Sequence, residues 1–350
     1  MKNYDAWDIK PVDPEQVSAK ELYRNLAGWA VLAANAHNVQ PWRFILRPQE
    51  KRIDVCVDPA GVLPASDKRG RQAHISVGCA IENLMLAAEY YGLAPECQYA
   101  APALYPAPTA KVFFKGAGPV DAAKAALLNA MKQRRMNRGE YDSAKPLGAE
   151  VLAEIRKAAE GLGLTLHEIG DPATRFAIAE IQYLAGRAVV ARTDFRKELG
   201  AFLLPNDTAS GKGMPGNTFG LSDQMADYVH KELNKDGPFD PDLAVGIAAS
   251  DRDGIKSAPL IGVISVPTDK PEWWLKAGRA FERIALITEM NGLAIAVHAA
   301  MVEVEMFNLM LKARLVTLKR PTVIFRMGFA KEARPHSPRS SAADVSEVIE

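Results

Sequence analysis

The chain has 350 residues, of which 48% are apolar and 24% are charged, and its formal net charge is +1. This composition indicates a globular protein long enough for two domains and excludes a disordered chain. No basic run dominates and no stretch of 18 apolar residues occurs, so we expect neither nucleic-acid binding nor a membrane span. The N-terminus has no apolar signal core, and Cys56, Cys79 and Cys97 show no disulfide framework. These features predict a cytoplasmic protein with reduced thiols.

The first 118 residues contain a mixture of helical and strand patterns. In chain order they predict a helix over 14–33, strands over 43–47 and 52–58, a loop over 59–70, a helix over 71–91 and a strand over 111–115. Apolar residues at helical spacing support the two helices, and the short PQEK linker indicates a hairpin between the two strands. Gly and Pro residues then mark a domain boundary near residue 118.

The remainder of the chain has a similar mixture. We predict a helix from about 120, a helix after Pro146, a strand over 164–169, a helical region over 172–199, a strand over 260–266, a helix over 270–291, a strand over 293–299, a helix over 302–315 and a strand over 320–329. Residues 200–258 give no clear pattern. Within them, the small and polar run 207–217 predicts a mobile surface flap. Apolar residues at 202–204, Phe219 and Leu221 would anchor it.

Two long helical stretches, 78–93 and 278–293, are related in sequence. They read GCAIENLMLAAEYYGL and GRAFERIALITEMNGL, at an offset of 200. Seven of the sixteen positions are identical, among them Gly78 and Gly278, and Glu82 and Glu282. Two unrelated amphipathic helices with a shared glycine cap are the alternative, but amphipathicity does not explain paired Gly and Glu positions. An internal duplication, packed like a symmetric dimer fused into one chain, explains them better.

The stretch AANAHNVQPWRF, residues 33–44, is unusually rich in amides. Pro41 cannot lie inside a helix and favours extended geometry for Gln40. The side chains of Asn35, Asn38 and Gln40 can donate and accept hydrogen bonds at once. The stretch therefore predicts either a loop around a flat ligand with polar edges or an ordinary capped turn.

Arginines concentrate in QRRMNRGEY, residues 133–141. Arg134 and Arg138 share a face whether the backbone is helical or extended, and two guanidinium groups on one face suit a phosphate. Arg339, in HSPRSS near the C-terminus, is a third candidate for the same phosphate. A solvated basic turn is the alternative for each.

Other motifs predict no chemistry. GKGMPG, residues 211–216, matches the letters of a dinucleotide-binding loop but lacks a strand before it. The six histidines, at positions 37, 74, 167, 230, 298 and 336, show no metal-binding spacing. No pairing of nucleophile and base is visible. We therefore predict no metal site and no catalytic side chain.

Taken in order, these motifs resemble those of the nitroreductase family. The loop A-N-A-H-N-x-Q-P-W is similar to the family's S-S-x-N-x-Q-P-W, RRMNR to its R-x-S-x-[RK], GLAIAVHA to the stretch beneath the flavin, and SPR to the closing phosphate clamp. The chain as a whole, over roughly residues 15–345, resembles the single-chain, duplicated Acg-type FMN-binding branch. The resemblance implies an α+β fold in two tandem halves, 1–118 and 119–350, each a mostly antiparallel sheet with flanking helices, with 200–258 as a lid.

The resemblance also implies where FMN binds. In family homodimers one subunit supplies the S-S-x-N loop and the other supplies the remaining motifs, so this chain would hold one complete site. Arg134 and Arg339 would hold the phosphate, and Arg138 the ribityl chain or the N1/O2 edge of the ring. The other implied contacts are Ala34, Asn35, Ala36, Asn38 and the backbone near Ala299, close to flavin N5. His298 would lie beside the flavin.

This sequence departs from the family pattern at four of these positions. Met136 replaces a hydroxyl residue, Asn35 and Ala36 replace two serines, and Ala299 stands where many reductases carry a glutamate. The implied function is NAD(P)H-linked reduction of a small acceptor such as a nitroaromatic or a quinone. The alternatives are an FMN-binding or storage protein with a lid-covered flavin and little turnover, and an interaction module with a decayed site. We expect a monomer, with a dimer as the alternative.

Overall fold

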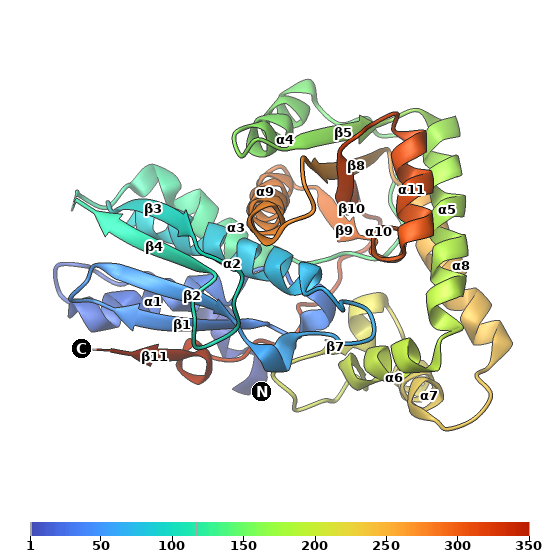
Figure 1. Ribbon diagram of the computed structural model, residues 1–350, viewed down its shortest axis with the longest axis horizontal. Coiled ribbons are helices and arrows are strands. Elements are labelled where there is room, and N and C mark those ends of the chain that lie inside the picture. Colours follow the sequence, from blue (N-terminus) through green and yellow to red (C-terminus); the bar gives the residue numbers. More distant parts are fainter. Residues whose placement is uncertain (1, 117, 350) are drawn as a thin grey trace.

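The computed structural model describes residues 2–116 and 118–349. Two long helices, α2 (Arg71–Tyr90) and α9 (Pro271–Met290), pack against each other at the centre, with one β-sheet on each side (Figure 1). The strands pair mainly antiparallel, and helices flank both sheets. The predicted α+β class, with two mostly antiparallel sheets, is confirmed.

The first sheet contains five strands in the order β11-β1-β2-β4-β3. Their bounds are β11 (Ser346–Val348), β1 (Trp42–Arg47), β2 (Arg52–Val57), β4 (Ala110–Lys115) and β3 (Ala94–Tyr99). The hairpin predicted from the PQEK linker is the antiparallel pair β1–β2. Helix α1 (Ala19–Ala30) begins later than predicted, because Ser18 and Glu21 form a capping box.

The second sheet contains four strands in the order β5-β8-β10-β9, all antiparallel. Their bounds are β5 (Thr165–Ile169), β8 (Leu260–Val266), β10 (Arg320–Gly328) and β9 (Ala294–Val297). Helices α3 (Ala125–Gln133) and α4 (Ala149–Glu160) precede them along the chain. All of these elements lie within or close to the predicted ranges. Among the residues described, no helix is both long enough and apolar enough to span a bilayer.

The stretch between β5 and β8 contains more helix than predicted. The region 172–199 is two helices, α5 (Pro172–Val190) and α6 (Thr193–Phe202), and the stretch without a pattern contains α7 (Asp223–Asn234) and α8 (Pro241–Ser257). The helix predicted over 302–315 is divided at Val304 into α10 (Ala300–Glu303) and α11 (Glu305–Arg314). The short elements are β6 (Leu203–Leu204), β7 (Met214–Pro215), η1 (Lys2–Asp8), η2 (Ala36–Asn38), η3 (Pro59–Gly61), η4 (Ala122–Lys124), η5 (Gly216–Phe219) and η6 (Ala342–Val345).

Helices α2 and α9 approach each other at two glycines. A Cβ atom on Gly78 would lie 2.2 Å from the carbonyl oxygen of Leu275, and one on Gly278 would lie 1.9 Å from that of Ile75. Adding the offset of 200 converts Ile75 into 275 and Gly78 into 278, so each contact is the image of the other. The crossing therefore has the reciprocal contacts of a two-fold interface.

Residues that are equivalent by the same offset also meet directly. The Arg69 guanidinium pairs with the Asp269 carboxylate, and the rings of His74 and Trp274 contact edge to face at 5.7 Å. A residue can contact its own equivalent only close to a symmetry axis. A local two-fold axis therefore passes near these pairs.

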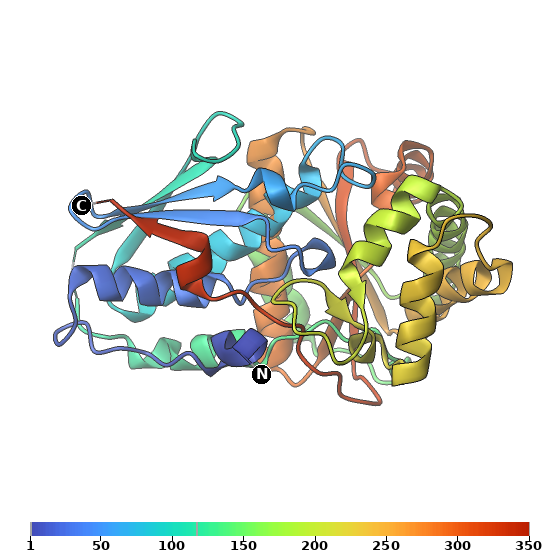
Figure 2. The ribbon, with the colours of Figure 1, turned by 90° about the horizontal axis from the view of Figure 1, so that it is seen from below.

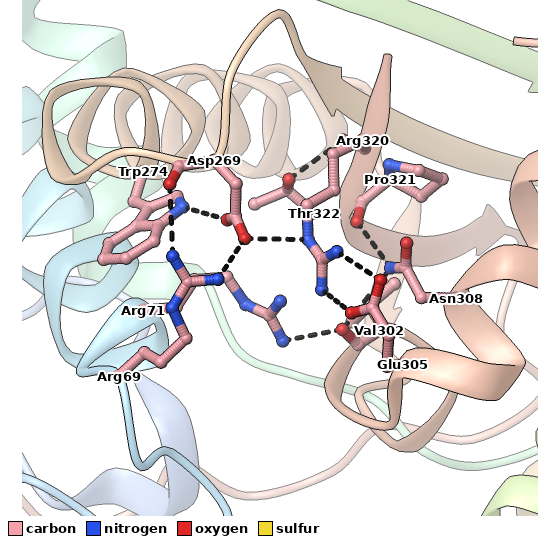
Figure 3. A network of polar contacts seen from close by, with 10 residues as sticks. All are labelled: Arg69, Arg71, Asp269, Trp274, Val302, Glu305, Asn308, Arg320, Pro321 and Thr322. Atoms are coloured by element: carbon pink, nitrogen blue, oxygen red, sulfur yellow. Dashed lines mark hydrogen bonds and ion pairs between the residues drawn. The ribbon is translucent and has the colours of Figure 1, made fainter. Parts of the chain in front are cut away.

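Around this point, polar contacts join the loop before α2 to the second half (Figure 3). Asp269 accepts from the Trp274 indole at 2.8 Å and also pairs with Arg320, which in turn pairs with Glu305 at 2.9 Å. The buried Arg71 donates to the carbonyl oxygen of Val302 at 2.6 Å. These contacts fix the N-terminal end of α2 against the second half.

The two chain ends lie on the first half. Strand β11 pairs in parallel with β1, so the last residues of the chain complete the first sheet (Figure 2). Trp7 stacks on His336 at 4.1 Å, and its indole donates to the carbonyl oxygen of Ser337 at 3.0 Å. The C-terminal segment thus runs from the second half to the first, across the boundary between the two halves, which we call the seam.

We predict that Gly278→Ala destabilises the protein by about 1–3 kcal/mol, the usual effect of overpacking a close contact. The opposing atom is a backbone carbonyl, which cannot rotate away as a side chain does. Equilibrium urea unfolding measures the loss. Gly246→Ala on α8 is the matched control: no atom lies within 4 Å of the added Cβ, so its stability should stay equal or rise. Equal stability of the two variants would contradict the close crossing.

Candidate functional site

Two adjoining cavities lie where the first half meets the second. The smaller has a volume of about 40 Å³ and the larger about 390 Å³. They share five lining residues: Ala34, Asn35, Met136, Arg138 and Met214. The eight residues predicted to bind a cofactor all line one cavity or both, namely Ala34, Asn35, Ala36, Asn38, Arg134, Arg138, Ala299 and Arg339. The structure brings them together, and their role as cofactor ligands stays a prediction.

The amide loop (residues 33–44) follows the C-terminal end of α1 and enters the seam. The Ala34 N–H donates to the Glu282 carboxylate at 3.0 Å, and the Ala36 N–H donates to the Ser76 hydroxyl at 3.1 Å. Helices α9 and α2 therefore both hold the loop. His37, Asn38 and Gln40 have positive φ angles of 45°, 53° and 52°, a region that residues other than glycine rarely adopt.

The side chain of Asn38 connects three segments of the chain. Its Nδ2 donates to the carbonyl oxygens of Gly213 and Pro338, both at 2.8 Å, and its Oδ1 accepts from Arg339. One buried amide thus connects the amide loop by hydrogen bonds to the 207–217 segment and to the C-terminal segment. Asn38 also lines the smaller cavity, and its contact with a cofactor stays a prediction.

Gln40 makes a second connection between the same segments. Its Nε2 donates to the Gly211 carbonyl at 2.7 Å, and its Oε1 accepts from the Ser340 N–H at 2.9 Å. The Gln40 N–H donates to Asn35 Oδ1 at 2.8 Å. The extended geometry predicted for Gln40 is wrong, because these bonds hold its backbone in the left-handed region despite Pro41.

The segment 207–217 is held more firmly than predicted. Besides the bonds from the amide loop, Asn3 donates to the carbonyl oxygens of Thr208 and Ser210, both at 3.1 Å. Residues 213–216 are buried, so the prediction that the whole run lies on the surface is wrong. Gly and polar composition suggested mobility, but the partner groups lie on segments distant in sequence.

Two buried arginines, Arg134 and Arg339, line the smaller cavity. Their exposed fractions are 2% and 6%. Arg134 donates to the Leu32 carbonyl at 2.6 Å, and Arg339 donates to the Ala33 carbonyl at 3.2 Å. Both guanidiniums thus cap free carbonyls just past the C-terminal end of α1, where cations are favoured. Arg339 Nε has no hydrogen-bond partner among the residues described.

This end of the site carries more positive than negative charge. The fully buried Glu282 lies 3.1 Å from Arg134 Nε and is the carboxylate that faces both arginines. Burial, and then the neighbouring Arg134 guanidinium, lower the pKa of Arg339 to about 9. Two buried cations beside one carboxylate leave a net positive charge, which an anion in the smaller cavity would neutralise.

Arg138 lies where the two cavities join. The backbone from Arg134 onward is extended, with the Asn137 N–H bonded to Ile295 at 2.9 Å, so the extended alternative is the one observed. The Arg138 guanidinium lies 4.5 Å from the centre of the Phe219 ring. Burial lowers its pKa, and Asp251 opposes that shift.

Residues 172–258 supply 18 of the 40 residues that line the larger cavity. Helices α5 to α8 contribute apolar side chains, including Val189, Phe195, Leu199, Val229, Leu243 and Ile247. Phe219 and Leu221, expected to anchor the flap, pack against a small core that includes Leu203 and Met214. Asp251, which also lies on α8, and His298 line the same cavity. The cavity thus has a broad apolar wall and a small polar region.

Several residues of the site were not singled out from the sequence. Glu282 was noted only because it aligns with Glu82 in the sequence repeat. Trp7 and His336 line or border the smaller cavity, but they come from opposite ends of the chain. Asp251 lies in the stretch that gave no pattern. No local signal identified these residues, because the contacts that give them a role are long-range.

We predict that Asn38→Gly loosens the 207–217 segment. Glycine adopts positive φ without strain, so the change removes the amide and leaves the backbone free to keep its path. Losing three hydrogen bonds of about 0.5–1.5 kcal/mol each should speed amide exchange at Gly213 at least tenfold. Hydrogen–deuterium exchange measures it. His37→Gly, at a similar φ of 45°, should leave exchange there unchanged, and equal protection in Asn38→Gly would refute the fastening role.

No family model matches the sequence. The chain is 23% identical over 338 residues to two proteins of Mycobacterium tuberculosis, strains CDC 1551 / Oshkosh and H37Rv, whose names propose an NAD(P)H nitroreductase. Each alignment covers 94% of this chain and 91% of the relative. This similarity supports the nitroreductase resemblance over nearly the whole chain.

Solved structures of nitroreductases are also similar. An FMN-dependent nitroreductase of Mycobacterium smegmatis in complex with NADPH matches 66% of this chain and 100% of its own, with 14% identity and a TM-score of 0.44. A nitroreductase of Desulfitobacterium hafniense with bound FMN matches 64% of this chain and 98% of its own, with 12% identity and a TM-score of 0.40.

Proposed function

We propose that the chain is an FMN-dependent oxidoreductase of the nitroreductase type. It takes hydride from NADH or NADPH and reduces a small acceptor such as a nitroaromatic or a quinone. One FMN binds per chain, across the seam between the two halves. The relatives named as NAD(P)H nitroreductases support this function, as do the motifs that line the two cavities.

The observation that carries the proposal is the buried excess of positive charge at Arg134 and Arg339. An uncompensated cation is costly to bury, and each guanidinium presents a planar fork that suits phosphate oxygens. Glu282 faces both guanidiniums. The half-buried Glu289 interacts electrostatically with Arg134 and also with Arg135, so three arginines face two carboxylates. A purely structural arginine pair would be expected to have a carboxylate for each member.

The rest of the site fits the other parts of FMN. The larger cavity, of about 390 Å³, lies within the usual range for a cofactor site and has a mostly apolar wall. Arg138 stands between the two cavities, where a cation would stabilise an anionic reduced flavin. The flavin, when bound, supplies the redox chemistry, and the chain binds and orients it. Met136, which replaces a hydroxyl, borders both cavities without adding a hydrogen bond.

We further propose that the halves 1–118 and 119–350 arose by duplication and act as a pseudo-dimer in a monomeric, cytoplasmic protein. The reciprocal contacts at Gly78 and Gly278 support this origin. The position equivalent to Glu282 is Glu82, which pairs with Arg279 and Arg283 at 2.9 and 2.6 Å. The Arg279 and Arg283 side chains are 14% and 34% exposed, so water solvates them and no buried excess of positive charge arises there, which supports a single FMN site.

We predict that Arg339→Ala weakens FMN binding by about 10- to 100-fold, the loss expected for a charge-assisted hydrogen bond of about 1.5–3 kcal/mol. Fluorescence titration of flavin-free protein measures the dissociation constant, and its end point should be one FMN per chain. Arg339 is a cleaner test than Arg134, because removing Arg134 also leaves the buried Glu282 without its cation.

Arg175→Ala is the matched control for this titration. Arg175 is also buried and also donates to a backbone carbonyl, that of Ala258, but it lines neither cavity. It should lower stability and leave FMN affinity unchanged. Equal affinity of the Arg339 and Arg175 variants, or an end point of two, would overturn the assigned site.

A second function, FMN binding or storage with little turnover, is favoured by one observation. The 207–217 segment is bonded to Asn38 and Gln40 at the edge of the site, and 200–258 would then act as a closed lid. Anaerobic mixing of FMN-loaded protein with NADPH separates the two functions. We predict flavin bleaching within seconds for a reductase. Bleaching by dithionite but not by NADPH, relieved by Asn38→Gly, would favour the storage protein.

A further inference from the structure

His298 is a buried imidazole at the edge of the larger cavity. His298 follows β9, and its backbone N–H donates to the Ile324 carbonyl at 3.0 Å, which fixes the main chain at this residue. The side chain is 3% exposed and lines the cavity. Neither ring nitrogen has a hydrogen-bond partner among the residues described. Buried polar atoms are rarely left without partners, so this ring is a candidate to bind a molecule in the cavity.

A series of contacts orients the ring. The Met301 N–H donates to Gln182 Oε1 at 3.2 Å, and Gln182 Nε2 donates to Asp251 Oδ2 at 2.8 Å. The other carboxylate oxygen, Asp251 Oδ1, lies 3.4 Å from His298 Nδ1. Asp251 therefore faces one ring nitrogen and leaves Nε2 for a bound molecule. A carboxylate beside Nδ1 is the usual positioning partner of an acid–base histidine.

The charges around His298 are Asp251, Arg138 and Arg326. Burial lowers the pKa of His298, Asp251 opposes that shift, and the two arginines add to it. The ring is therefore mainly neutral at pH 7 and gains its proton as the pH falls. Negative charge that develops on a bound molecule would favour the protonated ring.

We propose that His298 is the proton donor to an oxygen-bearing two-electron acceptor in the larger cavity, with Asp251 as its positioning residue. The proposal rests on the proposed function. Reduction of a quinone to a quinol adds two electrons and two protons. A hydride, supplied by NAD(P)H through the bound cofactor, would bring both electrons and one proton and leave a quinol anion. The second proton moves from Nε2 of the protonated His298 ring to the quinol oxygen: the N–H bond breaks, the O–H bond forms, and a proton from water restores the imidazolium.

The apolar wall of the larger cavity determines which other groups the acceptor can carry. Val189, Leu243 and Ile247 offer no hydrogen bonds to a bound molecule. A molecule with its oxygen at His298 would therefore place an apolar ring or substituent against α5 and α8. This combination selects an apolar carbonyl or nitro compound over a sugar or an amino acid.

The test compares an acceptor whose reduction needs protons with one whose reduction needs none. FMN-loaded protein, reduced with one equivalent of dithionite, is mixed in a stopped-flow instrument with 1,4-benzoquinone or with ferricyanide. Ferricyanide takes electrons alone. We expect His298→Gln to slow reoxidation by benzoquinone about 100-fold, the contribution typical of a general acid, and to leave the ferricyanide rate unchanged. The wild-type benzoquinone rate should rise as the pH falls, and the variant's rate should not.

Two further variants sharpen the test. Asp251→Asn should give an intermediate loss with benzoquinone and move the pH profile to lower pH, because the carboxylate raises the pKa of His298. His167→Gln is the control, since His167 lies on β5 and lines neither cavity. It should behave as the wild type with both acceptors.

A readout without flavin is the pKa of His298 itself. A ¹⁵N-histidine NMR titration of flavin-free protein identifies its signal by its absence from His298→Gln, and Asp251→Asn should lower that pKa further. Equal losses with benzoquinone and ferricyanide, or an unchanged benzoquinone rate, would overturn the role of His298 while FMN still binds. Failure of the wild type to bind FMN would instead overturn the proposed function, and the acceptor role with it.

Discussion

The contact between α2 and α9 is the constraint on which the rest of the structure depends. Because Gly78 and Gly278 carry no side chain, each helix backbone reaches the other, and the two halves meet along a narrow seam. The amide loop then lies beside Glu282 on α9 and Ser76 on α2. Any larger residue at the crossing would separate the halves and widen the site between them. The packing of two glycines thus sets the dimensions of a cavity formed by residues distant in sequence.

Glu282 links that crossing to the chemistry of the site. Its position on α9 brings it to the buried end of the seam, where it accepts from the amide loop and faces Arg134. Without this carboxylate, two guanidiniums would repel each other in a medium of low dielectric constant. With it, one charge remains uncompensated. Glu282 therefore reduces the repulsion between the two buried arginines in the folded chain, and the remaining positive charge still favours binding of an anion.

Periodic segments were predictable from the sequence, and long-range contacts were not. The strand pair β1–β2, the buried strand β8 and the helices α2 and α9 follow from apolar spacing and turn residues. The repeat at an offset of 200 also indicated reciprocal packing. By contrast, α7 and α8 start at Ser222 and Asp240 with sound capping residues, but Gly and Asp within and around them obscure their apolar faces. The role of Asn38 as a fastener depends on Gly213 and Pro338, which no local pattern connects to it.

The stretch 172–258 makes the two halves functionally unequal. It has no counterpart in the first half, and it supplies both part of the apolar wall of the larger cavity and Asp251, the residue that faces His298. At the equivalent point on the other side of the axis, Glu82 is already paired with two arginines. A homodimer would repeat every residue on both sides of its axis. A single chain with two halves can instead differ on the two sides, and under the proposed function one side would hold the phosphate, the acceptor and the acid–base pair while the other side would serve for packing.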